Sequence, residues 1–142
     1  MKFLNKLSEN VDKLLIPIVA IAGIALVYSY LQKGGAEDIK PPQDDAWFQT
    51  QVIDAGEPVV VKFGADWCGP CRSLDKVIDE YQQQSGSVKV VKIDVDERGD
   101  LASHYKVSGI PKVIMFKQGQ PVAQFVGSRP LDGFSSWIES NR

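Results

Sequence analysis

The chain contains one uncharged, apolar run that a small globular domain cannot enclose. The run extends from Leu14 to Gln32 and reads LLIPIVAIAGIALVYSYLQ. As a helix it would be about 28 Å long, at about 1.5 Å per residue, which is close to the roughly 30 Å hydrocarbon thickness of a bilayer. Because it is apolar on every face, the rest of a 142-residue chain cannot bury it in its own core. The sequence therefore predicts a transmembrane helix over residues 14–32.

A cleaved signal peptide is the competing interpretation, with Gly34 to Ala36 as a weak cleavage site. The apolar region of a signal peptide normally has only about 7 to 15 residues, so the length of this run favours an uncleaved anchor. The flanking charges weakly favour a cytoplasmic N-terminus. Three lysines precede the run and two follow it: Lys2, Lys6, Lys13, Lys33 and Lys40. We therefore expect the rest of the chain to lie outside the cytoplasm.

The remaining sequence is organised as one domain behind a polar linker. We expect a cytoplasmic segment over residues 1–13, the anchor over 14–32, a Gly- and Pro-rich linker over 33–43 and the domain over 44–142. Charged residues make up 24% of the chain and the net charge is −2, with no cluster of basic residues. This composition gives no indication of nucleic-acid binding, and we expect a monomer.

Strands and helices alternate through the predicted domain. We expect a first helix from Asp44 or Asp45 to about residue 55, and a last helix beginning at Leu131. Between them we expect buried strands over 57–63 and 88–96, a helix over 68–84, a short helix after Arg98, and two strands over 111–127 joined by a turn at 118–120. Such alternation implies parallel pairing through right-handed crossovers, with the final hairpin adding an antiparallel part. The predicted fold class is α/β, with a mixed central sheet flanked by helices.

Both cysteines of the chain lie in the stretch FGADWCGPCRSL, residues 63–74. A closed structural zinc site commonly needs four Cys or His ligands, and the chain has only two Cys and one His. A c-type haem attachment would need a histidine where Arg72 stands. A structural staple between residues three apart closes too small a loop to stabilise a fold much. These comparisons favour a redox pair.

The start of a helix is a suitable place for thiol chemistry. Its unpaired N–H groups and partial positive charge favour a thiolate, and so we expect them to lower the pKa of the Cys68 thiol. Cys71 lies one turn later, where it can attack a mixed disulfide formed by Cys68. The predicted chemistry is thiol–disulfide exchange, with Cys68 as the nucleophile and Cys71 as the resolving cysteine.

The segment WCGPC, Trp67 to Cys71, resembles the active-site motif of the thioredoxin family. The resemblance continues through DDAWFQTQVIDAGEPVVVKFGADWCGPC, VKIDVDE, YKVSGIPKVIMFKQGQ and FVGSRP, and covers roughly residues 44–142. It implies a thioredoxin fold, a redox-active disulfide between Cys68 and Cys71, and a cis peptide bond before Pro111. It also implies a shallow substrate-binding surface made of Trp67, Gly69, Pro70, Gly109, Ile110, Val126 and Gly127.

The sequence departs from the family pattern directly before the motif. Thioredoxins usually carry a buried aspartate where this chain has Lys62, and the lysine that partners it aligns with Val90. A neighbouring position that is often Trp is Gly64, which leaves room near the site. Two interpretations of Lys62 stay open. Its stem can lie along the sheet edge with the ammonium in water, or its amine can lie under the cysteines, where it modulates thiol chemistry.

The resemblance implies an enzyme that reduces disulfides in proteins. With the anchor, it suggests a protein of the bacterial inner membrane with a single transmembrane helix and its thioredoxin domain in the periplasm. Its electrons would come from a DsbD-type membrane carrier, since we find no NADPH or flavin motif and expect no cofactor or metal. Two alternatives are a dedicated apocytochrome c thiol reductase, and a binding or chaperone subunit that uses the fold without turnover.

Overall fold

The computed structural model describes residues 21–25, 27, 40–42, 44–84 and 86–142. The chain consists of two units, residues 1–34 and 35–142. In the first unit, residues 21–25 and 27 are helical and exposed. Within the described residues, no helix combines the length and the apolarity needed to cross a bilayer. The predicted segment 1–13, most of the anchor and most of the linker lie outside the described residues, so these assignments stay predictions.

The second unit is built on a four-stranded mixed sheet with the strand order β2-β1-β3-β4. β1 pairs with β2 in parallel and with β3 in antiparallel orientation, and β3 pairs with β4 in antiparallel orientation. The strands are β1 (Val59–Gly64), β2 (Lys89–Asp94), β3 (Lys112–Lys117) and β4 (Gln120–Val126). These four strands confirm the predicted mixed sheet, and the turn at Gln118 and Gly119 joins the expected hairpin.

The direction of β3 differs from the expectation of parallel pairing through every crossover. α3 (Gly69–Gln84) has 16 residues and rises about 1.5 Å per residue. It is therefore long enough to carry the chain back along a six-residue strand, which rises roughly 3.3 Å per residue. α4 (Gly99–His104) is too short to do so. The chain therefore re-enters the sheet at the end where it left, and Lys112 at the start of β3 lies opposite Phe63 near the end of β1.

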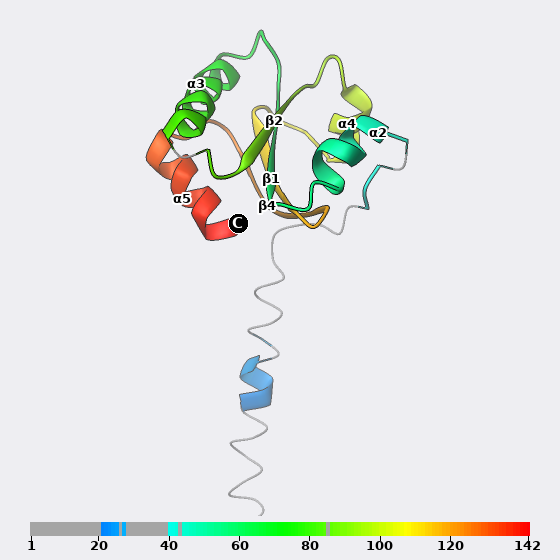
Figure 1. Cartoon of the computed structure of the whole chain (residues 1–142), viewed down its shortest axis with the longest axis vertical. Coiled ribbons are helices and arrows are strands. Elements are labelled where there is room, and N and C mark those ends of the chain that lie inside the picture. The colour runs from blue at the N-terminus through cyan, green and yellow to red at the C-terminus, as the bar shows by residue number, and fades with distance from the viewer. Residues whose placement is uncertain (1–20, 26, 28–39, 43, 85) are drawn as a thin grey trace, which may run out of the picture. The chain divides into compact units, whose positions relative to one another are not determined.

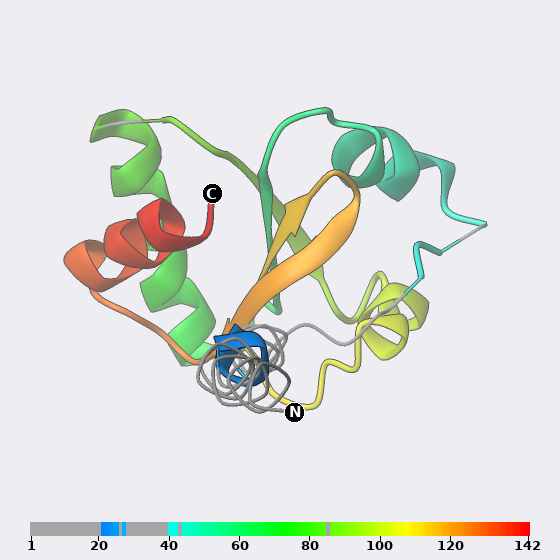
Figure 2. The same cartoon turned by 90° about the horizontal axis from the view of Figure 1, so that it is seen from below.

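Helices cover both faces of the sheet. Figures 1 and 2 show α3 and α5 (Leu131–Asn141) on one face, and α2 (Ala46–Phe48) with α4 on the other. α2 continues directly into η1 (Gln49–Ile53), a π-helical turn. The side chain of Asp45 caps this first helical segment by accepting a hydrogen bond of 2.9 Å from the backbone N–H of Phe48. The helix predicted from residue 44 or 45 to about residue 55 is thus confirmed.

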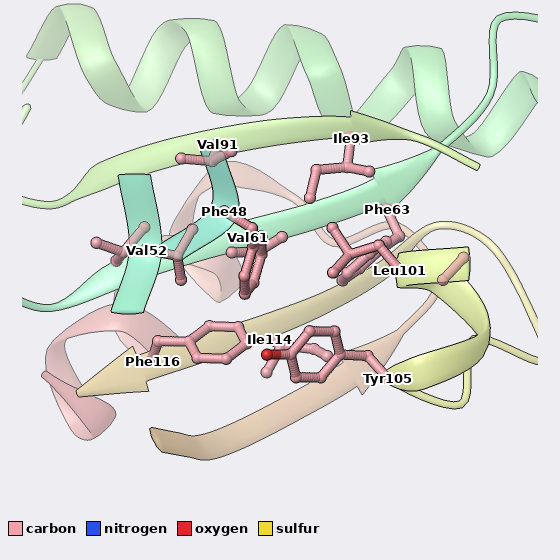
Figure 3. Packing of buried hydrophobic residues seen from close by; sticks show 12 residues of the cluster. Phe48, Val52, Val61, Phe63, Val91, Ile93, Leu101, Tyr105, Ile114 and Phe116 are labelled. Carbon is pink, nitrogen blue, oxygen red and sulfur yellow. The ribbon is translucent and has the colours of Figure 1, made fainter. Parts of the chain in front are cut away.

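The two faces hold two separate apolar cores. Odd-numbered β1 residues, such as Val61 and Phe63, face α2, η1 and α4, where they pack with Phe48 and Tyr105 (Figure 3). Even-numbered β1 residues turn toward α3 and α5, and Val60 packs there with the second core. This strict alternation follows from the period of two along a strand. It also places Lys62 on the face that α3 covers.

Candidate active site

Cys68 and Cys71 form a disulfide bond at the start of α3, with a Cα–Cα distance of 5.2 Å. Cys68 is 6% exposed and Cys71 is fully buried, so Cys68 is the sulfur that an incoming substrate meets first. The backbone N–H of Cys71 points at the Cys68 sulfur, 3.2 Å away. This arrangement favours negative charge on Cys68 once the disulfide is reduced.

The loop before β3 lies beside the disulfide. The peptide bond between Ile110 and Pro111 is cis, as the family resemblance implies. The carbonyl oxygen of Ile110 lies 3.9 Å from the Cys68 sulfur. A segment 42 residues away in sequence is therefore brought against the redox sulfur, with its backbone next to the point of attack.

The end of β4 adds the remaining part of the predicted surface. The backbone N–H of Gly127 donates a hydrogen bond of 2.8 Å to the carbonyl of Pro111. Val126 is 61% exposed, and its Cγ1 lies 3.4 Å from the position that a Cβ on Gly109 would take. The loop and the strand are therefore neighbours at Gly109 and Val126. The end of β4 thus lies against the loop whose Ile110 carbonyl borders the disulfide.

Trp67 directly precedes Cys68 in the sequence and is 69% exposed. Its indole Nε1 donates a hydrogen bond of 2.8 Å to Asp96 Oδ2, which follows β2. Asp96 is itself placed by a turn in which its backbone N–H donates to Asp94 Oδ1 at 2.8 Å. We did not predict the contact between Trp67 and Asp96, since the two residues lie on different loops. Gly69 and Pro70, also expected at the surface, are exposed on the first turn of α3.

A family model named Thioredoxin matches residues 40–140. The chain is 45% identical over 100 residues to thioredoxin of Synechocystis sp., covering 70% of this chain and 94% of that protein. It is 47% identical over 98 residues to thioredoxin 1 of Synechococcus elongatus, covering 68% and 92%. To mitochondrial thioredoxin of Mus musculus it is 39% identical, covering 68% and 59%.

The chain belongs to the thioredoxin family. Its disulfide, its cis-proline and its sheet agree with that assignment, and the Cys68–Cys71 pair makes it a disulfide oxidoreductase. The family match begins at residue 40, so it does not include the apolar run of residues 14–32. Within the matched residues, the features that set this thioredoxin apart are Lys62 and its neighbours between the sheet and α3.

Lys62 is the main departure, and the structure decides between the two interpretations of its position. The residue is only 5% exposed, and its Nζ donates a hydrogen bond of 2.9 Å to Asp75 Oδ2 on α3. The ammonium therefore does not extend into water along the sheet edge. Lys62 lies in the space between the sheet and α3, on the side of the cysteines.

β2 carries a second lysine close to Lys62. In the strand register Val90 lies opposite Val60, and the residue opposite Lys62 is Lys92. A lysine of β2 thus lies beside Lys62, two residues after Val90. Lys92 Nζ lies 2.7 Å from Asp79 Oδ1 and 3.6 Å from Asp75 Oδ1. Two lysines and two aspartates thus form one network that joins β1 and β2 to α3.

Proposed function

We propose that this thioredoxin is held at a membrane by residues 14–32 and reduces disulfide bonds in proteins outside the cytoplasm. The observation that carries the reductase assignment is the Cys68–Cys71 disulfide, which lies at a helix start beside the cis-proline loop. The Gly69–Pro70 pair between the cysteines, which resembles the reducing members of the family, supports the direction. The apolar run and its flanking lysines support the tether and the topology.

The reaction begins at Cys68. In the reduced protein the Cys68 thiolate attacks a substrate disulfide, forms a mixed disulfide, and releases the first substrate thiolate. The N–H of Cys71, which lies 3.2 Å from the Cys68 sulfur in the oxidised form, stabilises that thiolate. Cys71 then attacks Cys68 Sγ, the Cys68–Cys71 bond forms, and the second substrate thiolate leaves. The substrate gains two electrons and the protein loses two.

The substrate would bind as an extended strand across the disulfide. The backbone of Ile110 offers hydrogen-bonding groups to such a strand in the manner of an added β-strand. Trp67, Gly109, Val126 and Gly127 provide a shallow apolar surface on both sides, with Gly69 and Pro70 at the exposed helix start. A shallow surface of this kind accepts many protein substrates, because main-chain hydrogen bonds supply most of the affinity.

A reductant in an oxidising compartment must itself be reduced. We propose that a DsbD-type membrane electron carrier passes two electrons to the Cys68–Cys71 disulfide. A tether of residues 14–32 would keep the domain close to such a carrier and raise the effective concentration of one for the other.

Insulin reduction by the full-length protein in mild detergent, with dithiothreitol as electron source, tests the catalytic part of this proposal. We expect precipitation of the reduced insulin chains to accelerate with wild-type protein and not with Cys68→Ser. Equal rates with the two proteins would mean that the fold serves binding without turnover.

Location and partners need experiments in cells. A Cys71→Ala variant should accumulate mixed disulfides through Cys68, and mass spectrometry of the trapped species from membranes identifies the substrates. An alkaline phosphatase fused after Arg142 should be active if the domain lies outside the cytoplasm. An inactive fusion that is present in normal amount would contradict the proposed topology.

A further inference from the structure

Lys62 and Asp75 form an ion pair between β1 and α3, on the face of the sheet that supports Cys71. The side chain of Lys62 is 6% exposed and that of Asp75 is 30% exposed, so the pair joins the buried interior to the surface. The 2.9 Å hydrogen bond from Lys62 Nζ to Asp75 Oδ2 fixes the ammonium inside. The carboxylate is the member of the pair that water can reach.

The Lys62 ammonium and the Cys71 sulfur both border the space beside Gly64. A Cβ placed on Gly64 would lie 2.7 Å from Lys62 Nζ and 3.2 Å from Cys71 Sγ. The separation of the nitrogen from the sulfur therefore cannot exceed the sum of these two distances. A side chain at position 64 would therefore displace the end of the Lys62 side chain.

Asp75 is also a neighbour of Cys71 along α3. The two residues are four apart, so their side chains lie on the same helical face. One carboxylate oxygen, Oδ2, accepts the Lys62 hydrogen bond. The other, Oδ1, is buried and has no hydrogen-bond partner among the described residues, with Lys92 Nζ at 3.6 Å. Asp75 Oδ2 is therefore the oxygen to which Lys62 can pass a proton.

The charged and titratable groups that face this pair come from three elements. β1 supplies Lys62, β2 supplies Lys92, and α3 supplies Cys71 and Asp79 in addition to Asp75. Lys92 is shared between Asp75 and Asp79 and is 39% exposed. The buried members are therefore Lys62 and Cys71, and Asp75 connects them to the surface.

Resolution of the mixed disulfide requires Cys71 to lose a proton at a site that is fully buried. A buried thiol cannot transfer it directly to bulk water, so a neighbouring group has to accept it. The Lys62 ammonium borders the same space beside Gly64 as the Cys71 sulfur, and Asp75 is hydrogen-bonded to Lys62.

We propose that Lys62 and Asp75 form a proton-transfer pair for the resolving cysteine, an inference that rests on the proposed exchange reaction. Lys62 passes one ammonium proton to Asp75 and receives the proton of the Cys71 thiol. Cys71 becomes a thiolate, Lys62 stays an ammonium beside it, and Asp75 becomes a neutral acid. The thiolate then attacks Cys68 Sγ, and Asp75 later releases its proton to water. When the disulfide is reduced, the same proton path runs in reverse.

Two-step thiolate release from an aromatic disulfide separates this role from that of Cys68. Reduced full-length protein in mild detergent is mixed with excess 5,5′-dithiobis(2-nitrobenzoate) in a stopped-flow instrument. The first equivalent of coloured thiolate reports attack by Cys68, and the second reports resolution by Cys71. The variants are Lys62→Met and Asp75→Asn. The matched control is Asp79→Asn, which makes the same change one turn further along α3.

We expect both variants to slow the second phase at neutral pH by at least tenfold, since general acid–base catalysis is typically worth about 10²- to 10⁴-fold. The first phase should change by less than about twofold, and the control should match wild type in both phases. The deficit should shrink as the pH rises, because hydroxide then removes the Cys71 proton. A merely structural defect would slow both phases at every pH.

Gly64→Ala gives a second test that leaves every charge in place. The added methyl group must displace the end of the Lys62 side chain, so we expect the second phase alone to slow. Normal second phases in Lys62→Met and Asp75→Asn, or slowing that does not depend on pH, would overturn the proton-transfer role. If wild-type protein releases no second equivalent, the exchange reaction itself is wrong.

Discussion

Replacing Tyr105 by Phe should not destabilise this thioredoxin, although Tyr105 is fully buried. Its ring packs in the core on the face of the sheet that α2, η1 and α4 cover. Its aromatic neighbours are Phe48 and Phe116, at centroid distances of 5.3 Å each. Its hydroxyl lies among apolar side chains (Figure 3), and it has no hydrogen-bond partner among the described residues. The substitution removes only this hydroxyl and keeps every ring contact.

The magnitude follows from the cost of burying an unpaired hydroxyl. Measurements on proteins put that cost at about 1–3 kcal/mol. Removing the oxygen recovers this cost, but it leaves a small void that destabilises the core and offsets part of the gain. We therefore expect Tyr105→Phe to raise the free energy of unfolding by up to about 1 kcal/mol. Tyr81→Phe is the matched control, because Tyr81 is 2% exposed and its hydroxyl is hydrogen-bonded to Ser87 Oγ at 2.8 Å. We expect that variant to lose about 0.5–1.5 kcal/mol.

The assay is urea unfolding of the oxidised full-length protein in mild detergent at pH 7, followed by circular dichroism and tryptophan fluorescence. Tyr105→Phe should move the midpoint up or leave it unchanged, and Tyr81→Phe should move it down. A loss of more than about 0.5 kcal/mol in Tyr105→Phe would refute the reasoning. It would mean that the hydroxyl has a partner in solution.

The same residue gives a pH signature. Burial raises the pKa of Tyr105 above the ordinary tyrosine value, and the negative charge of Asp45 adds to the shift. Above about pH 10, Tyr105 therefore keeps its phenol proton in the folded state and releases it in the unfolded state. Stability from this group is complete below the unfolded pKa of about 10 and falls as the pH rises above it. The slope of stability against pH above 10 should be smaller in Tyr105→Phe than in wild type.

Three further predictions address the cap, a turn and the tryptophan. Burial raises the pKa of Asp45, but hydrogen bonds and the guanidinium of Arg98 outweigh it, so that the pKa is lowered in total. Asp45→Asn should therefore lower the free energy of unfolding by about 1 kcal/mol at pH 7, as measured by urea titration. The loss should become smaller as the pH falls below about 4. Gly119→Ala should lower the midpoint of thermal unfolding, since Gly119 has φ of +74° and a Cβ there would lie 2.9 Å from Ile53 Cγ2; an unchanged midpoint would contradict the strain argument. Asp96→Ala removes the hydrogen bond that holds the Trp67 indole, so it should raise KM for insulin, which binds across the protein-binding surface. The rate with a small aromatic disulfide, which does not need that surface, should stay unchanged.

Local patterns were sufficient to predict most of the domain. The β-branched run before the cysteines and the apolar spacing after them predicted β1 and α3, because those signals depend on neighbours in sequence. The antiparallel entry of β3 was missed, since it depends on the length of α4 and not on the pattern of β3 itself. The hydrogen bond between Trp67 and Asp96 was missed for a related reason: it joins two loops whose approach is set by the whole sheet.

The position of Lys62 shows where sequence reasoning stops within the site. Alternation along β1 already places it on the face of α3, and a lysine on a covered face needs a partner there. The candidate was visible, because Asp75 follows Cys71 by four residues, but several carboxylates on α3 were equally available in sequence. The end of the Lys62 side chain occupies the space that Gly64 leaves free beside Cys71. From there its ammonium donates to Asp75. Lys62, Gly64 and Asp75 therefore belong to one arrangement, in which the lysine lies in the space beside Gly64 and Asp75 accepts its hydrogen bond.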